Sequence, residues 1–387
     1  MKTVINILTI LILLSSCNKE EAKHPLLDYL EISHHNPNEY VVKKFKSHDV
    51  IFIGENHYIK EQVEFVKNLI PDLYQNGIYT LGTEFVNYED SDLANKLITD
   101  EVFDNELAEL ISFKSTWHWG YKEYIDIYRE AWKLNKSLSK DARKFKIFGI
   151  QEVVDFSFVK KEEDLNNPKI MEKVFAGSLE FDEEEGYSAN TIQKEVLNFG
   201  EKALIHCGIH HGFTSYYQPF FSKKEGFLGR FQKERVGNLI KNKIGDKAIT
   251  IFIHGPWPSK EGYSYRRLPV DGILDSIFSI EKNRAYYPFG VDTKSTVFGD
   301  LKSENSVYKY GYNNFSLKDF CDGYIFLKPI NQYESVTAIP NFIKPEQVEY
   351  VKSQELDLRS HNLTAKDLND SIKIWLIKDQ KENNKIQ

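Results

Sequence analysis

The chain of 387 residues is poor in sulfur, with three cysteines and two methionines. No cysteines stand in a CxxC pair or at zinc-ribbon spacing, which excludes those metal sites. A chain of this length does not need a disulfide to hold its fold. We therefore expect Cys207 and Cys321, which lie in or beside predicted strands, to be buried thiols without a disulfide partner.

The chain also lacks a basic run and several enzyme motifs. Lys and Arg number 50 against 57 Asp and Glu, a formal net charge of −7. No nucleic-acid partner is expected, because phosphate backbones are bound through clustered Lys and Arg. The G-x-S-x-G elbow, the Walker loop and the dinucleotide fingerprint are absent, which argues against a standard serine hydrolase, a P-loop protein or a Rossmann oxidoreductase.

One apolar stretch, Ile7 to Leu14, follows Lys2 near the N-terminus. It is too short to cross a bilayer as a helix and fits the apolar centre of a signal peptide. Together with the small residues before Cys17 it resembles a bacterial lipobox, which implies that Cys17 is lipidated. An ordinary signal peptide with an incidental cysteine is the alternative.

The lipobox resemblance implies a location in the cell envelope, with the protein anchored to a membrane through lipid. Asn18 is not the Asp that resembles an inner-membrane retention signal, so an outer-membrane lipoprotein is expected. Whether it faces the periplasm or the outer surface stays open.

Short apolar runs that read as strands recur along the chain, and Glu or His stands at the ends of five of them. The pattern predicts an α/β fold: a central, mostly parallel sheet flanked by helices, with helical insertions and an acidic insertion near residues 155–190. The predicted strands are residues 50–53, 79–84, 145–150, 203–207, 248–253 and 323–327. The predicted helices are residues 26–32, 60–75, 93–98, 105–111, 121–134, 191–199 and 228–243, with one or two more after residue 344.

These segments suggest four parts of the chain. Residues 1–17 form the lipoprotein signal peptide, and residues 18–45 form a tether with a leading helix. Residues 46–330 form a single α/β domain, and residues 331–387 form a polar helical extension.

The sharpest motif is Gly54-Glu55-Asn56-His57, directly after the first predicted strand. Glu84 ends the next strand, and a parallel crossover would place it beside Glu55 and His57 at one edge of neighbouring strands. A carboxylate and an imidazole in such a place can bind a divalent metal or act as a base and its orienting partner.

A second motif, Gly208-Ile209-His210-His211-Gly212, follows a later strand. One of its histidines is expected to ligate or catalyse while the other packs, and His211 is the preferred candidate. His206, inside the strand, is interpreted as a core residue.

Weaker candidates surround these two motifs. Glu152 and His254 are polar residues at strand ends, but each stands alone. Trp117 and His118, at the start of a helix, would either wall the cleft or pack in the core. The acidic runs at 162–164 and 182–185 are interpreted as a solvated face and not as a metal site.

The order of these motifs resembles the erythromycin esterase / ChaN / Tiki superfamily. The matching residues are Gly54, Glu55, His57, Glu84 and Gly208 with His211. Residues 116–124 look like the Trp-rich helix start of ChaN-type haem-binding lipoproteins, and the lipobox is similar too.

The resemblance implies two functions, which stay open at this point. The first is hydrolysis of an ester or peptide bond, with Glu55 or Glu84 as general base. His57 and His211 would then stabilise the oxyanion or, with Glu84, bind a divalent metal (Mn, Co or Zn). A metal-free version keeps Glu55 as the base, with the histidines as proton carriers. The second is haem binding in iron uptake. The expected partners are a small-molecule or peptide substrate or haem, and a homodimer stays an open alternative.

Overall fold

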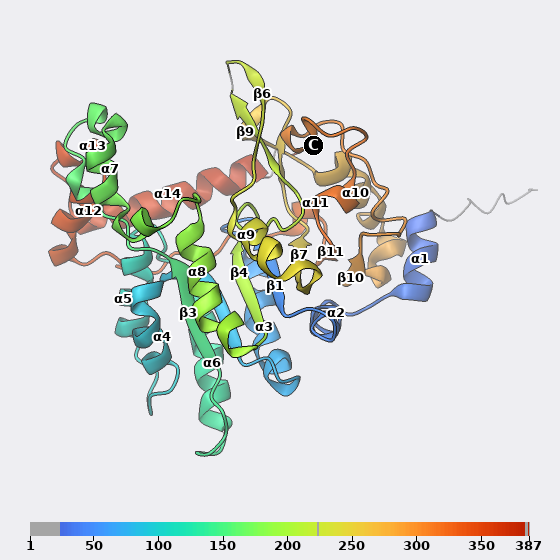
Figure 1. The fold of residues 1–387 in the computed structure, drawn as a ribbon, viewed down its shortest axis with the longest axis horizontal. Coiled ribbons are helices and arrows are strands. Elements are labelled where there is room, and N and C mark those ends of the chain that lie inside the picture. Colours follow the sequence, from blue (N-terminus) through green and yellow to red (C-terminus); the bar gives the residue numbers. More distant parts are fainter. Residues whose placement is uncertain (1–23, 223, 384–385, 387) are drawn as a thin grey trace, which may run out of the picture.

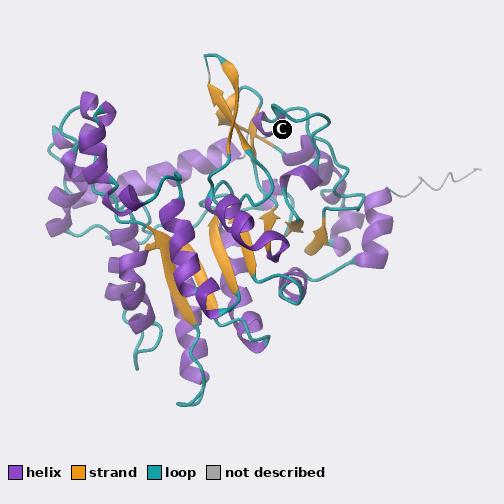
Figure 2. Ribbon diagram, in the orientation of Figure 1, coloured by secondary structure: helices purple, strands orange, loops and turns teal. Residues whose placement is uncertain are grey.

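The computed structural model describes residues 24–222, 224–383 and 386. The predicted signal peptide, the predicted lipidation site Cys17 and most of the tether lie outside this part. Within it, helices enclose one central sheet, as Figures 1 and 2 show. No described helix combines the length and the apolar character needed to cross a membrane.

The central sheet has seven strands in the order β10-β11-β7-β1-β4-β2-β3, and only the pair β10 and β11 is antiparallel. This confirms the predicted α/β fold with a mostly parallel sheet. The strands are β1 (Val50–Glu55), β2 (Thr80–Asn87), β3 (Lys146–Gln151), β4 (Ala203–Gly208), β7 (Ala248–Ile253), β10 (Phe289–Asp292) and β11 (Gly323–Phe326). Six of them are the six predicted strands, and β10 was not predicted.

Helices cover both faces of the sheet, which explains why its central strands are continuous apolar runs. Side chains of β1 alternate between the layers: Ile51 and Ile53 pack with the helix α3 (Lys60–Gln75), while Val50 and Phe52 pack on the opposite face. The other helices before β7 are α1 (Pro25–Ser33), α2 (Pro37–Lys44), α4 (Ser91–Leu97), α5 (Asn105–Ser115), α6 (Lys122–Ser137), α7 (Pro168–Val174), α8 (Gly186–Glu195) and α9 (Val236–Ile244). The two buried faces therefore fix the register of β1.

The order of the strands differs from the expectation at one point that matters for the site. Strands β1 and β2 are not neighbours, because β4 lies between them and pairs with both. The prediction that Glu55 and Glu84 lie on neighbouring strands was therefore wrong, although both are at the carboxyl edge. The insertion of β4 brings the loop after Gly208 between them.

Two antiparallel hairpins project beyond the sheet (Figure 1): β5 (Gln218–Ser222) with β6 (Gly226–Gln232), and β8 (Trp257–Ser259) with β9 (Gly262–Arg267). The predicted helix 228–243 was wrong over its first part, since α9 begins only at Val236. Gly226 and Gly229 have φ angles of 75° and 70°, which suit a hairpin and not a helix. The predicted helix 191–199 in fact begins earlier, at Gly186.

The rest of the chain wraps around the sheet. After β9 come α10 (Ile273–Phe278) and α11 (Leu317–Phe320), and the C-terminal part holds α12 (Val348–Gln354), α13 (Leu356–Arg359) and α14 (Ala365–Asn383). In Figure 1, α14 runs across the direction of the strands. Its residues Leu368, Ile372 and Leu376 are buried in the same core cluster as α3 and α6. The C-terminal helices are therefore packed onto the domain.

The thiols of Cys207 and Cys321 are free and buried, as the sequence predicted.

Candidate functional site

Four predicted residues, Glu55, His57, Glu84 and His211, converge at the carboxyl edge of β1, β4 and β2. Glu55 is the last residue of β1, Glu84 lies in β2, and His211 follows β4. Two hollows meet there, of about 350 Å³ and about 260 Å³, and both are lined by His57 and His211. The two imidazoles therefore stand at the centre of one continuous cleft.

Glu55 lies behind the cleft, with only 1% of its surface exposed. Its Oε2 is 2.6 Å from Nε2 of His206, and its Oε1 is 2.9 Å from Nδ1 of His57 and accepts the Tyr124 hydroxyl. Burial raises the pKa of this carboxyl, but the charges of His206 and His57 and their hydrogen bonds outweigh it and lower the pKa to about 2. Glu55 is therefore a charged, fully engaged acceptor.

His57 reaches from this buried anchor into the cleft, and 34% of its side chain is exposed. Its Nε2 lies 3.3 Å from Oε1 of Glu84. Burial lowers its pKa, but Glu84 and Glu55 outweigh this effect, so that the pKa is raised. Gly208 makes room for the ring, since a Cβ at that position would lie 2.9 Å from the His57 Nε2.

Glu84 is shared between the two imidazoles. Nε2 of His211 lies 3.5 Å from Oε2 of Glu84, and Nδ1 of His211 lies 3.0 Å from Oε1 of Glu185. The Arg235 guanidinium pairs with the same Glu185 oxygen at 2.7 Å. Burial lowers the pKa of His211, but Glu185 and Glu84 raise it to about 9. We call the series Glu55, His57, Glu84, His211 and Glu185 the carboxylate–imidazole chain.

The interpretation of the acidic run 182–185 as a solvated face was wrong for Glu185, whose side chain is only 10% exposed. Its Oε2 accepts the backbone N–H of Val236 at the start of α9, where unpaired amides favour a carboxylate. Burial raises its pKa, but His211 and Arg235 lower it to about 2. No local pattern distinguishes Glu185 from the acidic residues beside it, so the sequence could not single it out.

Two further residues of the site were missed in different ways. His206 is buried, as predicted for a core residue, but its ring also contacts Glu55. Tyr124 lies on the buried side of α6, where its hydroxyl reaches the same carboxylate. The alternation of side chains in β4 and the helical spacing in α6 predict that His206 and Tyr124 are buried. Neither pattern predicts that both contact the Glu55 carboxylate.

The supporting candidates divide into residues near the cleft and residues away from it. His210 lines the larger hollow, and its Nε2 lies 2.7 Å from the Tyr308 hydroxyl. Burial and the nearby Arg235 lower the His210 pKa to about 3, so its ring is neutral. Glu152 lines the smaller hollow and accepts the Ser178 hydroxyl.

His254 does not line the cleft; it is fully buried, with Nε2 3.1 Å from Oδ2 of Asp275 and Nδ1 against the Tyr324 hydroxyl. These contacts give it a place in the core behind the sheet edge. Gly54 is required by packing, since a Cβ there would lie 2.9 Å from the Cα of Ile209.

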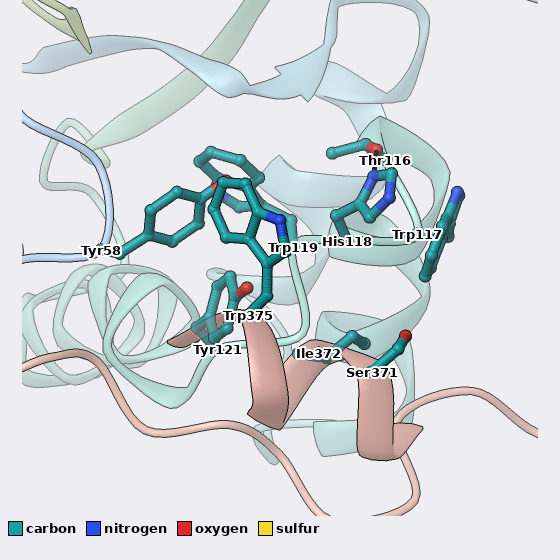
Figure 3. Close-up of a pocket in the computed structure, with 9 residues that line it drawn as sticks. All are labelled: Tyr58, Thr116, Trp117, His118, Trp119, Tyr121, Ser371, Ile372 and Trp375. Carbon is teal, nitrogen blue, oxygen red and sulfur yellow. Dashed lines mark hydrogen bonds between the residues drawn. The ribbon is translucent and has the colours of Figure 1, made fainter. Parts of the chain in front are cut away.

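Trp117 and His118 do not begin a helix; they lie in the connection between α5 and α6. The adjacent Trp119 is the residue that walls the cleft. The centroid of its ring is 5.2 Å from that of His57. The ring is also stacked on that of Phe85, with 5.1 Å between the two centroids. Trp117 and His118 line a separate aromatic hollow (Figure 3).

The geometry does not fit a ready metal site. Among the described residues, no group of three or more His, Cys, Asp or Glu side chains is arranged to hold a metal ion. The nitrogens of His57 and His211 each contact a carboxylate oxygen, as in a series of proton donors and acceptors. The chemistry that this arrangement supports directly is proton transfer.

No protein-family model matches the chain. No curated protein matches it either.

Solved structures do match. An erythromycin esterase in its open conformation is 11% identical, with a TM-score of 0.47, and the match covers 78% of this chain and 94% of that one. A Bacillus cereus protein is 10% identical, with a TM-score of 0.46, 77% of this chain and 92% of that chain being covered. A succinoglycan biosynthesis protein is 12% identical, with a TM-score of 0.48, covering 77% and 91%. The matches thus include a member of the superfamily that the sequence resembles, and this distant likeness concerns the fold alone.

Proposed function

We propose that the protein is a hydrolase of ester or peptide bonds that works by acid–base chemistry in the carboxylate–imidazole chain. One observation carries the proposal. Two imidazoles, exposed by 34% and 31%, approach the two oxygens of a single carboxylate, Glu84, and each is backed by a second, buried carboxylate. A surface that only binds a ligand has no need of such a series.

His57 is proposed as the general base. Glu55 accepts the Nδ1 proton of His57, so that Nε2 is the nitrogen that takes a proton from water as the water oxygen attacks the carbonyl carbon. Glu55 is a positioning residue in this scheme, since its carboxylate is buried and occupied by donors.

His211 is proposed as the acid. Glu185 and Glu84 favour its protonated form, so the imidazolium stabilises the developing oxyanion and gives its Nε2 proton to the leaving oxygen or nitrogen when the bond to carbon breaks. Glu84 lies between both Nε2 atoms and can pass the proton from His57 back to His211, which restores the starting state.

The shape of the cleft is consistent with a substrate that extends on both sides of the scissile bond. The hollow of about 350 Å³ lies toward His210 and Arg266, and the hollow of about 260 Å³ lies toward Glu152 and Thr116. One side would hold the acyl part and the other the leaving group.

A substrate screen with matched variants tests the proposal. We expect turnover of at least one member of a panel of 4-nitrophenyl esters and quenched fluorescent peptides. His57→Gln and His211→Gln should each lower kcat/KM by about 10²- to 10⁴-fold, the range for a lost general acid or base. His361→Gln is the control, because His361 is exposed and its ring contacts only its own segment. Equal rates for all four proteins would refute the assignment.

A divalent metal at His57, Glu84 and His211 stays a prediction of the superfamily resemblance. Metal analysis of the purified protein and dialysis against EDTA test it. Under the acid–base scheme the dialysed protein keeps its turnover. Loss of turnover that added Mn²⁺, Co²⁺ or Zn²⁺ restores would instead favour a metal-dependent hydrolase.

Haem binding and the lipid anchor are also proposals of resemblance. A haem titration followed by visible absorbance tests haem binding, and a saturable Soret shift would favour iron uptake.

Labelling of cells with an alkyne palmitate tests the lipid anchor, since Cys17→Ala should abolish incorporation and release the protein from the outer-membrane fraction.

A further inference from the structure

A third hollow, of about 280 Å³, lies beside the cleft between residues 116–121 and α14. We call it the aromatic pocket. Its walls carry six rings: Tyr58, Trp117, His118, Trp119, Tyr121 and Trp375. Figure 3 shows Trp375, Ile372 and Ser371 rising from α14 toward the segment that carries Thr116 to Tyr121.

Tyr58 contacts three of the other five rings. Its centroid lies 4.9 Å from Trp375, 5.3 Å from Trp119 and 5.4 Å from Tyr121. Its φ angle is 70°, a left-handed conformation that a bulky residue adopts only when its surroundings hold it there. The loop of the catalytic motif is therefore bent so that His57 faces the cleft and Tyr58 faces the aromatic pocket.

Two indole N–H groups in these walls, those of Trp117 and Trp119, are buried without a hydrogen-bond partner among the described residues. That of Trp117 has the Glu355 carboxylate nearby, so we single out that of Trp119. Trp119 is 9% exposed, and its indole Nε1–H has no hydrogen-bond partner among the residues that the structure describes. Buried indole N–H groups usually find a partner, and leaving one unpaired destabilises the fold. The ring that carries this donor lines both the aromatic pocket and the hollow of about 260 Å³, so an acceptor atom on a ligand bound there is the partner we infer for it.

The pocket is accessible and adjoins the cleft. Trp375 is 53% exposed, so one wall of the pocket is a side chain at the surface of α14. Tyr58 and Trp375 also line the hollow of about 350 Å³, and Trp119 also lines the hollow of about 260 Å³. One ligand molecule can therefore place one group in the aromatic pocket and another beside His57.

We propose that the aromatic pocket binds a flat apolar ring that carries a hydrogen-bond acceptor, as the part of the substrate that sets specificity. Ring walls favour a flat partner, because aromatic faces and edges stack on it, and the indole of Trp119 supplies the donor. The volume is just below the range of about 300–1,000 Å³ that suits drug-sized ligands, so one ring system of a larger molecule fits. That the ring belongs to a hydrolysed substrate rests on the proposed function; the pocket itself does not.

Equilibrium dialysis with two probes tests the pocket without any need for turnover. The probes are 2-acetylnaphthalene, which carries a carbonyl acceptor, and naphthalene, which carries none. We expect saturable binding of 2-acetylnaphthalene to the purified protein, at about one molecule per chain. Trp375→Ala should weaken it about tenfold through loss of one ring wall.

Two more variants make the test specific. Ile374→Ala, next to Trp375 and 65% exposed, changes the same helix without lining the pocket and should bind like the wild type. Trp119→Phe keeps a ring but removes the N–H, so it should weaken binding of 2-acetylnaphthalene about fivefold or more and leave naphthalene unchanged, as expected for a lost hydrogen bond.

The outcomes separate this inference from the proposed function. No saturable binding, or binding that Trp375→Ala leaves unchanged, overturns the pocket even if esters are hydrolysed. Binding that depends on Trp375 and Trp119 in a protein without hydrolase activity upholds the ring site and overturns only its link to turnover. If both hold, esters of 2-naphthol should show a lower KM than ethyl esters of the same acids, and Trp375→Ala should remove that difference.

Discussion

At the scale of single residues, the two imidazoles of the cleft have different tasks because their surroundings differ. The base, His57, must be neutral, and the acid, His211, whose pKa is about 9, must be protonated. We therefore predict that kcat/KM rises with pH as His57 loses its proton and falls above about pH 9 as His211 loses its own. Glu185→Gln removes the carboxylate that raises the His211 pKa most, so the alkaline limb should move to lower pH. An unmoved limb in that variant would contradict the assignment.

Glu55 is a second single residue whose replacement should have a clear effect, on the stability of the fold as well as on turnover. In Glu55→Gln the neutral amide cannot serve His206, His57 and the Tyr124 hydroxyl as the carboxylate does. Removing one partner of a buried ion pair costs about 3–5 kcal/mol, so the free energy of unfolding in urea should fall by about that amount. Glu346→Gln, at an exposed position, should change it by less than about 0.5 kcal/mol. A Glu55→Gln protein as stable as the wild type would show that the buried network contributes little.

At the scale of elements, the end of β4 decides the geometry of the site. A Cβ at Gly208 would lie 2.8 Å from Cε1 of His57, and this ring is partly exposed and can turn away. Gly208→Ala should therefore lower kcat/KM about 100-fold or more, because a base displaced by about 1 Å loses that much, while the melting temperature stays near that of the wild type. Full activity in Gly208→Ala would mean that His57 need not occupy its place beside Glu84.

Local sequence predicted the six parallel strands because each contains a short, mainly apolar run that is buried in the sheet. It could not predict the order of the strands, since the position of β4 between β1 and β2 depends on pairing across more than 100 residues. Residues 228–232 were predicted as helix, but they belong to the hairpin strand β6, which carries Phe227 and Phe231. In the fold they contact Tyr310 and Tyr312, and these tertiary contacts determine the hairpin.

The candidate site, like the fold, was predictable where it depends on local sequence and not where it depends on tertiary packing. Glu55, His57 and His211 follow from strand ends, because parallel strands share one edge. Glu84 was predicted to end its strand, but β2 continues past it to Asn87. Glu185 comes from the start of α8 and reaches His211 only through the packing of α8 and α9 beside β4. Such a residue carries no signal in its own segment.

At the scale of the whole molecule, the carboxylate–imidazole chain makes the stability of the fold depend on pH. Glu55 and Glu185 have pKa values of about 2 in the fold, below the ordinary value of 4.5. Groups with a lowered pKa stabilise the fold above their unfolded pKa, and this contribution is lost as pH falls through the folded one. We predict that the free energy of unfolding in urea declines from about pH 4.5 downward, and less steeply in Glu185→Gln. Parallel pH curves for both proteins would contradict the coupling.

The central claim is that His57 takes a proton from water at the junction of the two hollows, and chemical rescue tests it most directly. His57→Ala leaves the partly exposed position empty, so imidazole from solution can enter. We predict that kcat/KM on the best ester falls about 10²- to 10⁴-fold and that added imidazole restores turnover in a saturable way, with the pH dependence of imidazole itself. Wild-type turnover in His57→Ala, or a lost activity that imidazole does not restore, would contradict the account.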